Sequence, residues 1–351
     1  MLTIFKSRNT LTVNIHIVEK EKAMLFFTGI DDGNYDIKSP HTTMPAGYTS
    51  SEILPPMVSE YLLYDGVYYV PNQKRFKYLE DKTVNERSLI LVLFGIAQEI
   101  RYMAQKRAGQ DGDIQAEISK VTEIALGAGL PPSHMMAKGA AQKKIQYLEK
   151  HMKDGISFVY CGYKYSFKMV FCKIFPQDYA AIVVNTDDEI IKEYPKFVAV
   201  DIGGGTMDVI PFVDHLPDTA ACISVQSGIL YMYQNIILDV KRALGYTIDN
   251  KDIECVINKD KTVLPEDAKK LIMEDVQRWV DENIINELSQ SNISFAGTPV
   301  VFLGGGSKLL KSHINKNKVI MNQHFLKDPA RANAKGYAAL IKQMYQQSQK
   351  G

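Results

Sequence analysis

Apolar and polar residues follow two different periodicities along this chain. Apolar side chains recur every three or four residues in Thr83–Arg107 and in Pro265–Leu288, which predicts an amphipathic helix over each range. Ile156–Phe175 alternates with a period of two around Cys161-Gly162, which predicts a β-hairpin. Alternating strands and helices of this kind are typical of an α/β protein.

Shorter patterns predict further elements, with strands at 121–126 and 299–303 and helices at 138–153, 224–244 and 329–343. We expect the glycines and prolines of Gly127–Pro132 to end the first of these strands. We expect Asp328 to cap the last helix, because its carboxylate can accept free amides and Pro329 suits the first turn. Ser39–Lys82 is rich in Tyr, Pro and Gly and predicts a small irregular insertion with short strands.

One glycine-rich turn lies between two apolar runs in Phe197–Phe212. Asp201 ends the first run, and Gly203-Gly204-Gly205-Thr206 precedes the second. A glycine turn leaves backbone N–H groups uncovered, so that a phosphate can reach them. Asp201 is then placed to hold a hydrated cation beside that phosphate. Taken alone, the same pattern also fits a purely structural hairpin.

A second segment repeats the arrangement of an acid and a glycine after a strand. An apolar run from Met24 leads into Asp31-Asp32-Gly33-Asn34-Tyr35, and Lys38 follows. Matching acids in two strand-turn-strand units indicate two half-sites that face one ligand. Chance recurrence is the alternative, since an Asp-x-Gly after a strand is common.

A third glycine run, Gly304-Gly305-Gly306-Ser307, follows a predicted strand and opens a predicted helix. Its amides and the helix dipole suit the phosphates or sugar of a nucleotide, and a tight turn is the equal alternative. The run lacks the Gly-Lys-Ser/Thr ending of a P-loop and the spacing of a dinucleotide motif, as does the run at Gly203. The ordinary nucleotide folds are therefore disfavoured.

Composition narrows the class of protein. The 351 residues suit roughly two domains, and the formal net charge of +1 gives no electrostatic case for direct nucleic-acid binding. Four scattered cysteines lack metal-site spacing and indicate free thiols in a reducing cytoplasm. No apolar run approaches the ~20 residues of a membrane span, and the start lacks the apolar core of a signal peptide. We expect a cytoplasmic enzyme or assembly protein that does not bind membranes.

The order of these motifs resembles the actin-like ATPase superfamily over Met24–Gln343, and the closest likeness is to bacterial plasmid-segregation actins of the ParM type. The resemblance implies an actin-like, ribonuclease H-like α/β fold of two domains, each a mixed sheet with flanking helices, with the nucleotide in the cleft between them. The implied division is 24–198 plus 329–351 for domain I, with an outer subdomain at about 39–82, 199–328 for domain II, and an N-terminal extension at 1–23.

The resemblance also implies a role for each motif. Asp31 and Asp201 would organise Mg²⁺ through water, and Lys38 would approach the phosphates of ATP or ADP, with GTP as an alternative. Gln177 stands where the family carries Glu or Gln, and would orient the attacking water. The residues implied to surround the nucleotide are Asp32, Gly33, Asn34, Tyr35, Gly203, Gly204, Gly205, Thr206, Gly304, Gly305, Gly306 and Ser307.

The function implied is a filament-forming ATPase that drives plasmid DNA segregation in bacteria. Glutamine can orient water but is a poor base, so Gln177 indicates slow hydrolysis tied to polymerisation. The implied partners are further copies of the chain and a DNA-binding adaptor at a centromere-like site. A small-molecule kinase, with Asp178 as its base, and a non-polymerising chaperone-like ATPase are the alternatives.

Residues 1–23 precede the segment that resembles the family. Met24 looks like the natural start, and we expect 1–23 to derive from an upstream start codon. An added strand or arm for filament contacts is the alternative.

Overall fold

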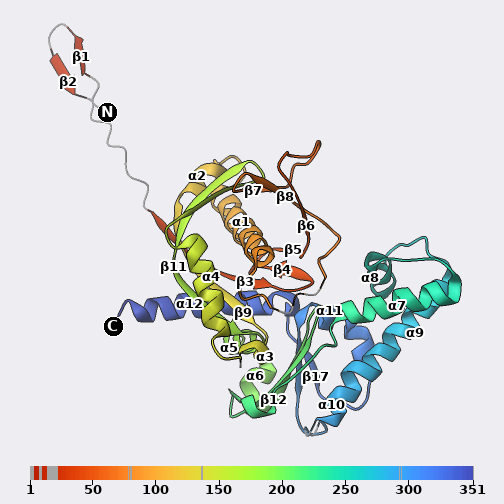
Figure 1. Ribbon diagram of the computed structural model, residues 1–351. Helices are drawn as coiled ribbons and strands as arrows, with labels where there is room; N and C mark the ends of the chain where they lie inside the picture. Colours follow the sequence, from red (N-terminus) through yellow and green to blue (C-terminus); the bar gives the residue numbers. More distant parts are fainter. Residues whose placement is uncertain are drawn as a thin grey trace.

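The structure is a computed structural model that describes residues 4–7, 10–13, 23–77, 79, 81–135, 137–291, 293 and 295–350. Two large β-sheets lie in separate lobes, each with helices beside it (Figure 1). Near the N-terminus, β1 (Ile4–Ser7) and β2 (Thr10–Val13) pair as an antiparallel hairpin. The expected origin of 1–23 is not tested by this hairpin, and most of that segment is outside the described residues.

The first sheet has nine strands in the order β5-β4-β3-β9-β11-β10-β7-β8-β6. Its centre is parallel, since β9 pairs in parallel with both β3 and β11, and its other pairs are antiparallel. The strands are β3 (Met24–Asp32), β4 (Asp36–Lys38), β5 (Thr43–Pro45), β6 (Tyr48–Ser51), β7 (Leu62–Tyr64), β8 (Val67–Pro71), β9 (Val121–Leu130), β10 (Ile156–Tyr160) and β11 (Tyr163–Pro176).

The second sheet has six strands in the order β14-β13-β12-β16-β17, and β15 pairs with β13. Strand β16 pairs in parallel with β12 and β17, whereas β12 and β13 form the predicted antiparallel hairpin. The strands are β12 (Lys196–Ile202), β13 (Met207–Val213), β14 (Leu216–Pro217), β15 (Ile223–Val225), β16 (Val300–Leu303) and β17 (Gln323–Phe325).

Within the described ranges, six helices precede β12 in the sequence. They are α1 (Glu86–Ala108), α2 (Ile114–Ser119), α3 (Pro132–Met135), α4 (Ala140–Met152), α5 (Tyr179–Val184) and α6 (Glu189–Glu193). Those that follow the first hairpin of the second sheet are α7 (Ile229–Leu244), α8 (Asn250–Asn258), α9 (Glu266–Val280), α10 (Asn286–Gln290), α11 (Gly304–Ile314) and α12 (Ala332–Ser348). Among the described residues, no helix is both long and apolar enough to cross a membrane.

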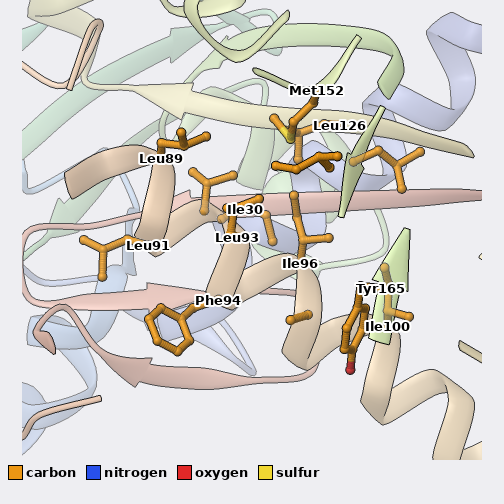
Figure 2. Close-up of a cluster of buried hydrophobic side chains, with 14 of the residues drawn as sticks. Ile30, Leu89, Leu91, Leu93, Phe94, Ile96, Ile100, Leu126, Met152 and Tyr165 are labelled. Carbon is orange, nitrogen blue, oxygen red and sulfur yellow. The ribbon is translucent and has the colours of Figure 1, made fainter. Parts of the chain in front are cut away.

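Helix α1 supplies much of the first core. The apolar spacing predicted for it places Leu89, Leu93, Ile96 and Ile100 in one buried cluster. Figure 2 shows these side chains in the same cluster as residues of the sheet, including Ile30 of β3. Burying each such side chain contributes about 1.5–3 kcal/mol, so this helix holds β3 and its C-terminal acids in place.

The predicted break after residue 126 is wrong, because β9 continues through Gly127 and Gly129 to Leu130. Both glycines lie against Tyr337 of α12. A Cβ on Gly129 would come within 1.9 Å of the Tyr337 hydroxyl oxygen, and one on Gly127 within 2.6 Å of its carbonyl oxygen. The glycines therefore allow a helix to pack closely on the strand, and they do not mark a turn.

The predicted cap at Asp328 is also wrong. Asp328 accepts no capping hydrogen bond, and its carboxylate instead pairs with Arg331 and Lys335. A short 3₁₀ turn at Pro329–Arg331 precedes α12, which begins at Ala332.

Two other predicted helices are shorter than their apolar patterns. Residues 223–225 form β15, so the helix predicted from 224 begins at Ile229. The helix predicted to end at Leu288 is α9, which ends at Val280, and a π-helical turn and α10 follow it.

Candidate functional site

A pocket lies between the two sheets, where the turns after β3, β11 and β12 meet. The predicted site residues that line it are Asp31, Gly33, Asn34, Tyr35, Lys38, Gln177, Asp201, Gly203, Gly204, Gly205 and Thr206. The lining also includes residues that the sequence analysis did not select: Leu79, Lys82, Pro131, His134, Asp208 and Asn333. The structure thus brings the two predicted half-sites together around one space.

Asp31 and Lys38 form one wall of the pocket. They are directly opposite each other in the β3–β4 pair, and Lys38 Nζ lies 3.4 Å from Asp31 Oδ2. Burial acts to lower the pKa of Lys38, but the carboxylates of Asp31, Asp36 and Asp201 outweigh it and raise the pKa above its usual value. Lys38 therefore stays protonated in the pocket.

Asp201 forms the opposite wall, at the end of β12. It pairs in register with Asp208 of β13, and the turn between them is closed by a 2.9 Å hydrogen bond from Gly203 N to Thr206 O. Asn333 of α12 donates a hydrogen bond of 2.9 Å from Nδ2 to Asp201 Oδ2. The second half-site is thus tied to the C-terminal helix.

Asp208 lies behind this turn and is buried. Ser224 and Thr206 donate hydrogen bonds of 2.5 Å and 2.9 Å to its two carboxylate oxygens. Burial and the charge of Asp201 raise the pKa of Asp208, the two hydroxyl donors lower it, and the net pKa is about 6.

A tight turn directs Gln177 and Asp178 to different places. Asp178 has φ 65° and ψ −51°, and Tyr179 N donates to Gln177 O over 2.6 Å, which together form a γ-turn of the strained positive-φ form. The Gln177 amide lies in the pocket, 3.3 Å from Asp31 Oδ1. The Asp178 side chain is fully buried against Asp201 and does not line the pocket.

Asp178 has an unusual environment. Neither of its carboxyl oxygens makes a hydrogen bond of ordinary geometry with the described residues, although its backbone N–H donates to Asn333 Oδ1 over 2.7 Å. Burial, followed by the charge of Asp201, raises the pKa of Asp178 well above its usual value. This carboxyl therefore has no exposed oxygen with which to act as a base on a substrate.

Asp32 does not line the pocket, in contrast to its neighbour Asp31. Its carboxylate accepts hydrogen bonds of 2.8 Å from Lys144 Nζ and 2.5 Å from Ser88 Oγ, and all three side chains are buried. Burial acts to raise the pKa of Asp32, but Lys144 and Lys82 together hold it below its usual value. The structure therefore directs this predicted site residue away from the pocket.

The third glycine run lies behind Asp201 and does not line this pocket. Gly304 has φ 86°, and a Cβ there would come within 1.9 Å of Asp201 Oδ1, so only glycine fits. Gly306 packs on Ile202, and the Ser307 hydroxyl donates to the carbonyl oxygens of Leu303 and Gly304 within the helix. A Cβ on Gly305 would meet no atom within 4 Å, which leaves Gly305 as the residue of this run that faces open space.

Tyr35 contributes to both sides of the pocket. Its backbone follows the first turn, but its side chain is buried in the core of the second sheet, where its ring centroid lies 5.9 Å from that of Tyr233. Its hydroxyl donates a hydrogen bond to Glu254. A Cβ on Gly204 would come within 2.5 Å of the Tyr35 Cβ, so the second glycine turn packs directly on this residue.

These residues fit a magnesium-bound nucleotide. The pocket offers the Asp31 and Asp201 carboxylates, the Lys38 ammonium group and a glycine turn with accessible N–H groups. Within the described ranges, no group of three or more His, Cys, Asp or Glu residues could hold a metal ion alone. Asp31 and Asp201 could hold Mg²⁺, because proteins usually bind this ion with one or two carboxylates while water and substrate phosphates supply the other ligands.

Comparison with known proteins finds similarity to actin homologues, by sequence over one segment and by structure over most of the chain. A family model for the C-terminal domain of archaeal MreB-like actin homologues matches residues 199–316. An archaeal actin homologue in complex with ADP is 16% identical, with 90% of this chain and 99% of that chain covered and a TM-score of 0.64. A ParM filament from Clostridium botulinum is 18% identical, with 92% and 99% covered and a TM-score of 0.66.

The chain has an actin-like fold. This confirms the α/β fold class and the resemblance to actin-like ATPases of the ParM type that the motifs indicate. An AlfA filament bound to AMPPNP is a more distant match, with 15% identity, 92% and 100% of the two chains covered, and a TM-score of 0.54. A search of curated protein sequences finds no significant match.

Proposed function

We propose that this chain is a nucleotide-dependent filament-forming protein that hydrolyses ATP, with GTP as the alternative substrate. The observation that carries the proposal is the single pocket shared by the Asp31–Lys38 turn and the Asp201–Thr206 turn. Two matching half-sites on separate sheets suit a ligand that holds two domains together. The ParM and AlfA filaments among the structural matches support self-assembly.

The proposed chemistry assigns a role to each wall of the pocket. Lys38 attracts the phosphates by its charge, and the N–H groups of Gly203–Thr206 donate to phosphate oxygens. Mg²⁺, held through water by Asp31 and Asp201, would neutralise the charge that develops on the phosphate oxygens during hydrolysis. Gln177 orients the attacking water, and its contact with Asp31 fixes the side chain. Since an amide is a poor base, we expect slow hydrolysis.

The domain division and the cellular role are parts of the same proposal. We infer domain I from 24–198 plus 329–351 and domain II from 199–328. Strand β12 begins at Lys196, slightly before that boundary. We further propose that the filament moves plasmid DNA in the bacterial cytoplasm through a DNA-binding adaptor, because the net charge of +1 gives no electrostatic case for direct DNA binding.

Light scattering and phosphate release, measured on the purified chain after addition of ATP or GTP with Mg²⁺, test the proposal. We expect scattering that rises above a critical protein concentration and phosphate release that follows it. Asp201→Ala should abolish phosphate release, whereas the exposed Asp260→Ala should behave like the wild type. A wild-type chain that neither assembles nor hydrolyses either nucleotide would overturn the proposal.

The kinase alternative gains no support from the structure. It requires an accessible carboxylate as the base, and Asp178, the candidate for that role, is fully buried and does not line the pocket. Asp178 is therefore not positioned to act as the base in the transfer of phosphate to a small molecule.

A further inference from the structure

Lys82 enters the same pocket as Lys38 from a different part of the chain. It belongs to the segment between β8 and α1, here called the connecting segment and comprising residues 72–77, 79 and 81–83. Two hydrogen bonds tie this segment to the first phosphate turn, since Leu79 N donates to Asn34 Oδ1 over 3.0 Å and Asn34 Nδ2 donates to Leu79 O over 3.4 Å.

Arg75 adds a third attachment between the connecting segment and the first turn. Its Nε donates to Tyr35 O over 2.9 Å, and its guanidinium lies 3.5 Å from the centre of the Tyr35 ring. The connecting segment is therefore held against the turn that is expected to bind phosphate. This attachment fixes the direction from which Lys82 reaches the pocket.

The ammonium group of Lys82 has a carbonyl partner but no carboxylate partner. Its Nζ donates a hydrogen bond to the backbone oxygen of Asp32, and no ion pair to Lys82 occurs within the part of the chain that the structure describes. The nearest candidate, the Asp32 carboxylate, is already bound by Lys144 and Ser88. Lys82 is partly buried, and a cation that gives up part of its hydration without an anionic partner does so at a cost in free energy.

The electrostatic setting agrees with that geometry. Burial, reinforced by the nearby Lys144, lowers the pKa of Lys82 to about 8, although Asp32 and Asp31 act to raise it. Lys38, by contrast, lies among three carboxylates that raise its pKa. Of these two lysines, Lys82 is thus the one whose charge is less compensated by the protein.

We propose that Lys82 is a second phosphate-binding lysine, which favours a nucleoside triphosphate over a diphosphate. The inference rests on the proposed nucleotide function of this pocket. A triphosphate carries more negative charge than a diphosphate, and a poorly compensated cation in a partly buried pocket gains most from that extra charge. Lys38 binds both nucleotides because its charge is already balanced by its neighbours.

Isothermal titration calorimetry with Mg²⁺ and either AMPPNP or ADP tests this selectivity. Lys82→Met should weaken AMPPNP binding by about tenfold or more, the usual effect of losing a charge-assisted hydrogen bond, and ADP binding by less than about threefold. Lys82→Arg keeps the charge and should retain most of the preference. Lys77→Met, which removes an exposed lysine from the same segment, should match the wild type.

Equal losses for both nucleotides, or no loss for either, would overturn the role of Lys82 and leave the proposed function standing. A wild-type chain that binds neither nucleotide would overturn both. Thermal unfolding without nucleotide shows whether Lys82→Met folds, and Lys82→Gln replaces it in the titrations if it does not. The same selectivity loss is expected in that variant.

Discussion

The Tyr35 hydroxyl donates a hydrogen bond to Glu254, which lies 219 residues further along the chain. Tyr35 belongs to the turn between β3 and β4, whereas Glu254 lies in α8 beside the second sheet. The Tyr233 hydroxyl donates to the same carboxylate oxygen over 3.2 Å. Burial is the main reason that the pKa of Tyr35 is raised, so the phenol stays neutral and keeps its proton for this bond. The contact joins the two halves of the pocket that we propose binds the nucleotide.

Removing that hydroxyl should weaken the connection between the two halves. We expect Tyr35→Phe to lower the free energy of unfolding by about 1 kcal/mol, because one buried hydrogen bond to a carboxylate is lost while the ring packing remains. Urea titration followed by circular dichroism measures the change. Tyr246→Phe, at a partly exposed ring outside this network, is the matched control. Equal stability of the wild type and Tyr35→Phe would contradict a structural role for the contact.

Asp208 should make the stability of the nucleotide-free chain depend on pH. Its pKa of about 6 lies above the ordinary value of 3.8, so the folded state binds a proton more tightly than the unfolded state between these values. Stability from this group is therefore greatest below about pH 4 and falls as the pH rises through about 6. We expect a loss of about 3 kcal/mol from this group by pH 7, since each unit of pKa difference corresponds to about 1.4 kcal/mol.

Asp208→Asn should remove this part of the pH dependence, because the amide does not ionise. Urea titrations of the wild type and the variant at intervals from pH 4.5 to pH 7.5 supply the comparison. The gap between the two stabilities should shift in favour of the variant as the pH rises. Parallel curves over that range would show that Asp208 titrates as in the unfolded chain.

Asp31 and Asp201 could be selected from the sequence because the pattern that marks them lies within a few neighbouring residues. Asp31 and Asp201 both end apolar strands and precede glycine turns, and the structure brings them to one pocket because each turn occupies the same end of its sheet. The predicted end of the strand after residue 126 was wrong because Gly129 is small for another reason. It allows packing against a helix more than 200 residues away in sequence. Contacts of that range leave no local pattern.

Lys82 and Glu254 could not be selected as candidate residues from the sequence, for a related reason. Each is an ordinary charged residue in its own segment, and its role depends on the segment that packs against it in three dimensions. Asp32 is the opposite case, because it stands next to Asp31 in the sequence and the two acids look equivalent there. Their alternation along β3 leaves Asp31 in the pocket and Asp32 on Lys144.

Gln177 offers a way to separate hydrolysis from assembly. We expect Gln177→Ala to reduce the rate of phosphate release by about tenfold to a hundredfold, because positioned water is lost while the Lys38 and glycine-turn contacts remain. Nucleotide binding and the initial rise in light scattering should be nearly unchanged, and filaments should persist longer after ATP runs low. Gln347→Ala, at an exposed position on α12, is the control. If phosphate release matched the wild type, the attacking water would have to be oriented by another group, and among the described pocket residues His134 and Asn333 would then be the side chains to replace next.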